Sequence, residues 1–161
     1  MRNERIICGL IFLCCLPLEA LCAYLAFETI GEIVSLLYFI AAALNLPLAV
    51  LAWKKPLIGA IACIVLAAAI VPYQLVLAKR LVDVQAEATR IVAFAYSTKG
   101  DTGSFPSDLR SYSFANPSVA RFFQKYTRFR NSDGFQLVYR IGTVSTSHWY
   151  STEGGWGYAP D

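Results

Sequence analysis

Charged residues are scarce in this sequence, at 16% of its 161 residues, whereas hydrophobic residues make up 57%. Ordinary globular chains are about 25% charged and about 45–50% apolar. The composition excludes a disordered chain and disfavours a wholly water-soluble one.

The shortage of charge is confined to the first half of the sequence. Residues 79–161 contain ten Lys or Arg and seven Asp or Glu, but residues 6–78 contain only five charged side chains. These five are Glu19, Glu28, Glu32, Lys54 and Lys55. We therefore predict two domains, a transmembrane domain over residues 1–78 and an extracytoplasmic α+β domain over residues 79–161.

Residues that commonly carry catalysis or bind metals are few. His148 is the sole histidine, which excludes a multi-histidine metal site. Beside Trp149 and Tyr150, it is better explained as a strand residue than as a general base. Phosphate-binding loops, dinucleotide fingerprints and nucleophile elbows are missing as well. The sequence thus predicts a non-enzymatic protein with no cofactor and no metal site.

Cysteine is missing from residues 79–161, which excludes a disulfide framework there. The spacing of the cysteines in the apolar half favours small packing residues over metal or redox chemistry. The five cysteines are Cys8, Cys14, Cys15, Cys22 and Cys63.

Three apolar stretches are long enough to cross a bilayer, which takes about 20 helical residues. They are Ile6–Phe27, Ile33–Trp53 and Leu57–Ala78. A cleaved secretory signal is the alternative for the first stretch, but its length and the two spans that follow favour a retained helix. The short connections predict a small bundle of three antiparallel helices.

Basic residues beside the spans predict the orientation, because short loops rich in Lys and Arg stay in the cytoplasm. Arg2 and Arg5 precede the first span. Lys54 and Lys55 separate the second span from the third, while residues 28–32 carry no basic side chain. The pattern predicts a bacterial inner-membrane protein with a cytoplasmic N-terminus and a periplasmic C-terminal domain.

Glu19 is the one charge inside a span. A carboxylate there costs on the order of 2.5 kcal/mol or more near the bilayer centre, so it should face a partner, a cavity or the interface. Two interpretations stay open: a proton or partner site, or an interfacial carboxylate hydrogen-bonded to a neighbouring helix, for which Asn45 is a candidate. Each span also holds one proline that deletes a helical hydrogen bond, and these are Pro17, Pro47 and Pro72.

An amphipathic pattern continues beyond the third span. Apolar residues recur at three- and four-residue steps, and charged residues occupy the other side at Asp83, Glu87 and Arg90. Because no Gly or Pro occurs between Tyr73 and Thr98, we predict one helix of about 40 residues that ends at the loop 99–103. The apolar positions are Leu81, Val84, Ala88, Ile91 or Val92, and Ala95.

From Leu57 onward the sequence resembles the N-terminal helix and following loop of type IV pilins and of the pseudopilins of type II secretion. Pro72 matches the kink proline of that helix. The segments that carry the resemblance are 64–74, Gln85-Ala86-Glu87-Ala88, Ala95-Tyr96 and Gly103-Ser104-Phe105-Pro106-Ser107-Asp108-Leu109. The resemblance implies a long spine helix crowned by a small antiparallel sheet. Two extra spans come first, however, and residues 53–60 lack the prepilin cleavage motif, so filament assembly is not implied.

The remaining sequence predicts the elements of such a head. Asn116-Pro117 is a helix start, and 119–126 is predicted as a short helix. Alternating apolar residues predict a strand over 135–141. Two further strands, 147–151 and 156–159, are joined by a hairpin at 152–155, which gives an antiparallel three-stranded sheet packed on the long helix.

Two basic groups are candidate contacts for anions or lipid headgroups. Lys79 and Arg80 follow the third span, where they oppose the predicted orientation but are outweighed by the two basic ends. Arg121, Lys125 and Arg128 recur at four- and three-residue steps and would share one helix face. A solvated face is favoured over nucleic-acid binding, because the net charge is only +3.

These observations favour an inner-membrane protein that presents a pilin-like periplasmic domain to protein partners in the membrane or periplasm, in pilus or secretion-related assembly. The alternative is an accessory subunit of a larger membrane enzyme or transporter, with Glu19 facing a neighbour. The candidate contact residues are Trp149, Tyr150, Trp156 and Tyr158, although packing on the spine helix is an equal alternative for them.

Overall fold

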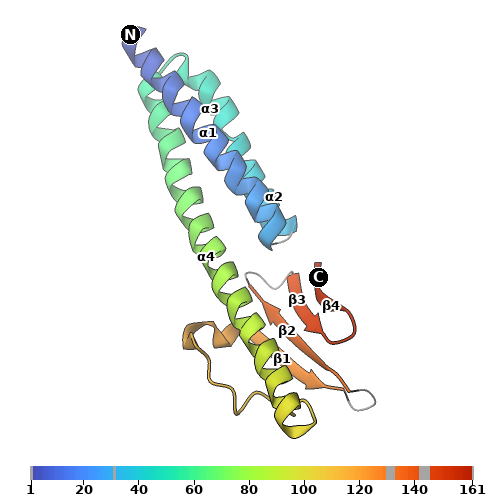
Figure 1. Ribbon diagram of the computed structural model, residues 1–161. Coiled ribbons are helices and arrows are strands. Elements are labelled where there is room, and N and C mark those ends of the chain that lie inside the picture. The colour runs from blue at the N-terminus through green and yellow to red at the C-terminus, as the bar shows by residue number, and fades with distance from the viewer. Residues whose placement is uncertain (1, 31, 130–132, 142–145, 161) are drawn as a thin grey trace. The chain divides into compact units, whose positions relative to one another are not determined.

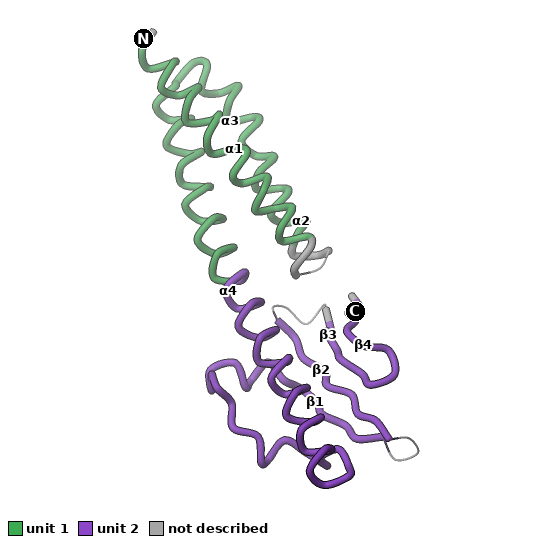
Figure 2. Tube along the Cα trace, in the orientation of Figure 1, with its two compact units in different colours: residues 1–76 green, residues 77–161 purple. Residues whose placement is uncertain are grey.

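A computed structural model describes residues 2–30, 32–129, 133–141 and 146–160 of the chain. It divides into two compact units, Met1–Val76 (unit 1) and Leu77–Asp161 (unit 2), shown in Figure 2. The division falls close to the change of composition near residue 78. Helix α4, Pro56–Thr102, contributes residues to both units.

Unit 1 is helical. It contains α1 (Arg2–Ile30), α2 (Glu32–Ala43), α3 (Asn45–Ala52) and the first part of α4. Three helical stretches are long and apolar enough to cross a membrane, namely Asn3–Phe27, Ser35–Ala52 and one within Pro56–Thr102. The three predicted spans are therefore confirmed as helices of sufficient length and apolarity.

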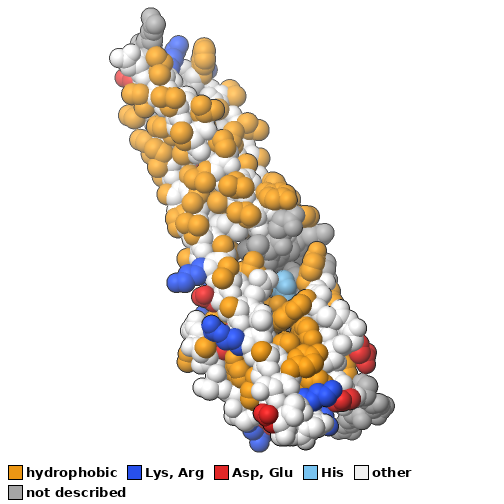
Figure 3. Space-filling view, in the orientation of Figure 1, with side chains coloured by type: hydrophobic (Ala, Val, Ile, Leu, Met, Phe, Trp, Pro, Cys, Tyr) orange, Lys and Arg blue, Asp and Glu red, His pale blue; other side chains and the backbone are white. Residues whose placement is uncertain are grey.

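The outer surface of unit 1 carries large apolar side chains, which cover its helices in Figure 3. Leu13, Val50 and Leu57 are at least 70% exposed. Contiguous apolar surface of this extent is rare on soluble monomers and marks contact with another protein or a membrane. Unit 1 thus has the surface that a bilayer would cover.

The second predicted span is divided into two helices in tandem. α2 ends at Ala43, and α3 begins at Asn45. Pro47 explains the break, because its ring collides with the carbonyl four residues earlier, which is that of Ala43. Pro17 and Pro72, in contrast, lie inside unbroken helices. The predicted connection at 28–32 is shorter than expected, because α1 runs to Ile30 and α2 starts at Glu32, and Gly31 lies outside the described residues.

Helix α4 is continuous from Pro56 to Thr102, which confirms the long helix predicted from the sequence. It includes Gly100 and ends four residues later than expected. Gly103 follows it with φ +78°, a left-handed conformation that glycine adopts without steric cost and that commonly ends helices.

Unit 2 contains an antiparallel sheet of four strands in the order β1-β2-β3-β4 (Figure 1). The strands are β1 (Phe123–Arg128), β2 (Phe135–Arg140), β3 (Thr146–Ser151) and β4 (Gly155–Pro160). The three predicted strands are confirmed in β2, β3 and β4, and β4 begins at Gly155, directly after the turn that connects it to β3.

The predicted helix at 119–126 is wrong. Asn116 does start a helical turn, since its side chain accepts a hydrogen bond from the Ser118 N–H at 3.1 Å, but the turn is a short 3-10 helix, η1 (Pro117–Phe122). From Phe123 the chain is strand β1, paired with β2. Pairing with a distant strand outweighs the local helical spacing of aromatic residues.

The core of unit 2 lies between α4 and the sheet. Residues of one face of α4 pack against the buried side chains of β2, which alternate along the strand as predicted. The fully or nearly fully buried members are Val84, Ala88, Ile91, Ala95, Phe105, Val119, Phe135, Leu137, Tyr139 and Ile141. This packing determines which face of the sheet lies against α4.

Candidate functional site

Aromatic side chains from β3 and β4 lie on the two faces of one hairpin. Tyr150 pairs with Trp156 and His148 with Tyr158, so these four side chains share a face. Their rings are in contact, with centroids 4.9 Å apart for Tyr150 and Trp156 and 6.1 Å apart for His148 and Tyr158.

Trp149 lies on the opposite face of the hairpin, directly across from Gly157. A Cβ atom at Gly157 would lie 2.7 Å from the Trp149 ring, so only glycine accommodates the ring there. Trp149 is therefore separated from the other three predicted contact residues.

The shared aromatic face continues the face of β2 that packs on α4. Leu137 pairs with Tyr150, and Tyr139 pairs with His148. Tyr150 packs against the core, and its hydroxyl lies 3.0 Å from the Tyr96 hydroxyl of α4. Burial, followed by the contact with Tyr96, raises the pKa of Tyr150 to about 12. Tyr150 is thus a packing residue.

Trp156 and Tyr158 extend this face beyond the core and remain exposed. Trp156 is 50% exposed and Tyr158 is 70% exposed. The sequence left contact and packing equally open for the aromatic residues. The structure divides them, with Tyr150 in the core and the two β4 side chains available to a partner.

A groove of about 340 Å³ lies between α4 and the exposed part of this face. Aromatic rings form most of its lining, and α4 supplies two polar side chains. The Thr89 hydroxyl donates to the Gln85 backbone carbonyl at 3.0 Å. The Gln85 side chain is exposed, and its amide group can both donate and accept a hydrogen bond. The lining residues are Gln85, Thr89, Tyr139, His148, Trp156, Gly157 and Tyr158.

His148 stacks between two of the groove residues. Its ring centroid lies 5.5 Å from that of Tyr139, with an angle of 18° between the two planes, and it also contacts the Tyr158 ring. Burial lowers the pKa of His148 below its ordinary value of 6.5, because the charged imidazolium is desolvated there. The groove is therefore lined by a neutral imidazole at neutral pH.

We expect His148 to be less than half protonated at pH 6.5 in the folded chain. The pKa of His148 is higher in the unfolded chain than in the folded chain, so protonation favours unfolding. The folded chain therefore has its full stability above pH 6.5 and loses stability as the pH falls through the pKa of the folded chain. NMR titration of the imidazole in detergent-solubilised full-length protein measures this directly, since the chain has one histidine. A midpoint at or above 6.5 would contradict the buried position of the ring.

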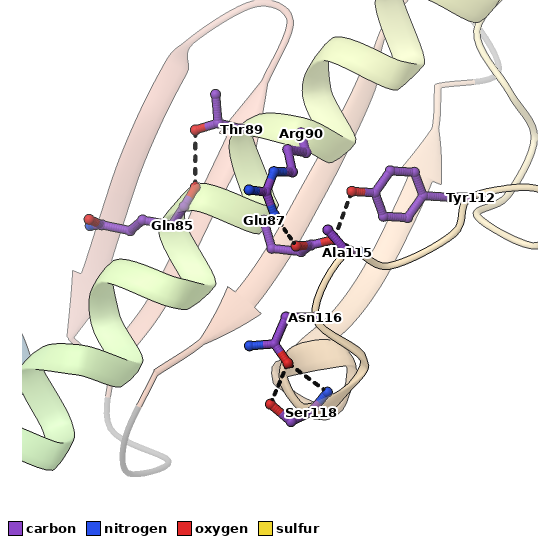
Figure 4. A network of polar contacts seen from close by, with 8 residues as sticks. All are labelled: Gln85, Glu87, Thr89, Arg90, Tyr112, Ala115, Asn116 and Ser118. Carbon is purple, nitrogen blue, oxygen red and sulfur yellow. Dashed lines mark hydrogen bonds and ion pairs between the residues drawn. The ribbon is translucent and has the colours of Figure 1, made fainter.

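A second polar feature of unit 2 is centred on Glu87 of α4, which is 0% exposed. Its Oε1 atom accepts hydrogen bonds from the Tyr112 hydroxyl at 2.8 Å and from the Ala115 N–H at 2.9 Å (Figure 4). Its Oε2 atom accepts from Arg90 at 3.0 Å. Glu87 therefore fastens the segment after α4 onto the helix, close to the start of η1.

These donors determine the charge of Glu87. Burial alone would raise the pKa of its carboxyl, but hydrogen bonds from Tyr112, Ala115 and Arg90 together with the charge of Arg90 outweigh burial and hold the pKa below its ordinary value. Burial and the adjacent carboxylate raise the pKa of Tyr112 to about 12. The sequence placed Glu87 on the solvent side of the helix, and this prediction is wrong.

The basic residues do not form one site. Arg121 lies in η1, whereas Lys125 and Arg128 lie in β1, so the predicted shared helix face is wrong. An odd separation along a strand places Lys125 and Arg128 on opposite faces. Lys79 is an exposed residue of α4.

Arg80 and Arg121 meet at one aromatic ring. The guanidinium carbons of Arg80 and Arg121 lie 5.1 Å and 5.0 Å from the Phe122 ring centroid. Arg80 also donates to the Ile141 carbonyl at 3.5 Å. Arg80 is thus engaged inside unit 2 through cation–π and hydrogen-bond contacts.

The two remaining candidate residues belong to unit 1. Pro72 is an exposed residue of α4. Glu19 is 0% exposed and accepts a hydrogen bond from the Asn45 amide, the contact considered from the sequence. The surface of unit 1 therefore does not present Glu19 to a neighbouring protein.

No protein-family model, curated protein or solved structure matches the chain. Among the described residues, no group of three or more His, Cys, Asp or Glu side chains is arranged to hold a metal ion. The chain's own geometry and surface chemistry are therefore the basis for its function.

Proposed function

We propose that the chain is a non-enzymatic protein of a bacterial inner membrane that presents unit 2 in the periplasm and binds a protein partner through the groove beside β4. The observation that carries the proposal is the exposure of Trp156 and Tyr158 at the mouth of an aromatic groove. Tyr and Trp are enriched at binding hot spots, because they bring a large contact area at low entropic cost.

The architecture of unit 2 supports a pilin-like role. A helix of 47 residues continues into a unit with a four-stranded antiparallel sheet, and the sequence from Leu57 onward resembles type IV pilins and type II pseudopilins. The proposed partner is accordingly a component of a pilus or secretion-related assembly. The basic residues that flank the spans support a cytoplasmic N-terminus.

The second candidate function, an accessory subunit of a membrane enzyme or transporter, required Glu19 to face a neighbour's cavity. Glu19 is buried by the chain's own helices and bonded to Asn45. The geometry therefore favours the groove-based proposal.

Photocrosslinking in cells tests the proposal. We expect a photoreactive phenylalanine analogue at position 158 to capture a membrane or periplasmic assembly protein, identified by mass spectrometry. Trp156→Ala in the same chain is expected to reduce capture roughly tenfold, because loss of a hot-spot side chain costs about 1–2 kcal/mol or more of binding energy.

The same analogue at Lys125 is the matched control, since Lys125 is also exposed but lies on β1. Equal capture from both positions, or none from position 158, would reject the groove as the binding surface. Protease protection of a tag after Asp161 in spheroplasts would reject the periplasmic orientation.

A further inference from the structure

Unit 1 buries a carboxyl group and an amide group against each other. Glu19 of α1 and Asn45 of α3 are both 0% exposed. The Asn45 side-chain nitrogen donates to Glu19 Oε2 and to the Ala42 carbonyl, the latter at 3.3 Å.

These two contacts fix the orientation of the Asn45 amide. Its nitrogen faces two acceptor oxygens, and rotating the amide by half a turn would place an oxygen against both. Asn45 Oδ1 and Glu19 Oε1 are the two side-chain oxygens that these contacts leave without a hydrogen bond. Neither has a hydrogen-bond partner among the described residues, and both are shielded from solvent.

Within the described part of the chain, no cation forms an ion pair with Glu19. Residues 6–53 contain no Lys or Arg, and residues 56–78 contain no charged residue. The titratable neighbours are Cys22 on α1 and Cys63 on α4, which interact electrostatically with Glu19, and Tyr38 on α2, which interacts with Cys22. An ionised carboxylate in such apolar surroundings carries a large desolvation cost.

Glu87 in unit 2 provides the contrast. Both glutamates are 0% exposed, but the Glu87 carboxylate accepts three hydrogen bonds, one of them from an arginine. Among the described residues, Glu19 accepts one hydrogen bond, from the neutral amide of Asn45. The partners of Glu87 suit an anion, whereas those of Glu19 suit a neutral acid.

We propose that Glu19 and Asn45 form a proton-binding site. The Glu19 carboxylate takes up one proton from water at Oε1, and the resulting carboxylic acid donates this O–H to Asn45 Oδ1 while Oε2 accepts from the Asn45 amide. One proton thereby gives Glu19 Oε1 and Asn45 Oδ1 a hydrogen bond and removes the negative charge. The two side chains are then joined by two hydrogen bonds that link the first span to the second. Such paired hydrogen bonds are favoured in a medium that offers no competing water.

Infrared spectroscopy of the full chain in phosphatidylcholine nanodiscs at neutral pH tests the site. We expect the carbonyl stretch of a protonated carboxylic acid, and we expect this band to shift when glutamate is labelled with ¹³C. Glu19→Gln should abolish the band, whereas Glu87→Gln should retain it and remove a carboxylate band instead. The ¹³C shift requires no variant, so it shows whether any of the six glutamates is a neutral acid even where a substitution impairs folding, and Glu19→Gln assigns the band to Glu19.

Asn45→Leu tests whether Asn45 is the hydrogen-bond partner of Glu19, because it removes the oxygen that accepts the acid proton. The acid band should then move to higher frequency, as expected for a weaker hydrogen bond, without losing its ¹³C sensitivity. Absence of a ¹³C-sensitive acid band in the unmodified chain would overturn the proposal. A band that does not move in Asn45→Leu would overturn the hydrogen-bonded pair with Asn45.

Discussion

Replacing Glu87 with alanine is expected to lower the free energy of unfolding of unit 2 by about 2–4 kcal/mol. The substitution leaves the Tyr112 hydroxyl and the Ala115 N–H without the carboxylate oxygen to which both donate. A buried donor without an acceptor costs about 1–3 kcal/mol. Denaturant unfolding of the full chain in detergent, followed by tryptophan fluorescence in a Trp53→Phe background, measures the change in unit 2.

Arg90→Ala is the matched control for Glu87→Ala. The Arg90 side chain is 57% exposed, so its loss should cost no more than about 1 kcal/mol. Equal losses from Arg90→Ala and Glu87→Ala would show that the surface ion pair, and not the buried donors, holds the segment in place.

Acid provides a second readout for Glu87. Because its folded pKa lies below the ordinary value of 4.5, its contribution is present above that pH and is lost as the pH falls through the folded pKa. Glu87→Gln should therefore flatten the acid side of the stability profile.

Local patterns were sufficient for the elements that have strong periodicity. The apolar runs predicted three spans, and the three- and four-residue spacing from Val84 to Ala95 predicted the face of α4 that packs on the sheet. The alternation from Phe135 to Tyr139 likewise predicted which side of β2 is buried. For the helix face and the strand face, the same period governs both the sequence and the packing.

Distant partners explain what the sequence could not predict. Phe123 and Tyr126 have spacing compatible with a helix, but their segment pairs with β2, which comes later in the chain. Glu87 has the character of a surface residue, and two of the donors that make its burial favourable, Tyr112 and Ala115, come more than 20 residues later in the chain. Carboxylates are almost never fully buried unless they are paired.

The sequence could predict the candidate site only in part. Aromatic alternation in β3 and β4 identified the residues, but not which of them faces α4. The cross-strand register places Trp149 opposite Gly157 and away from Tyr150, and α4 covers Tyr150 but not Tyr158. The break at Pro47, in contrast, follows from a local rule, because the residue four positions earlier is the last of α2.

Replacing Phe135 with alanine is expected to destabilise unit 2 by about 3–5 kcal/mol, the range for a large aromatic residue lost from a close-packed core. Phe135 is 0% exposed and contacts four aromatic rings. The centroid distances are 5.0 Å to Phe105, 5.2 Å to Tyr126, 5.6 Å to Tyr150 and 6.1 Å to Tyr96. The same unfolding assay in the Trp53→Phe background measures the loss.

Val138→Ala is the control, because Val138 lies on the same strand with its side chain half-buried on the opposite face. It should cost about 1 kcal/mol. The Phe135 ring contacts the ring of Tyr150, and Tyr150 pairs across the hairpin with Trp156. Phe135→Ala should therefore also weaken photocrosslinking of the partner at position 158. Equal destabilisation by the two substitutions would mean that the sheet does not depend on its α4-facing side, and the groove would then lack the rigid support on which the proposed binding depends.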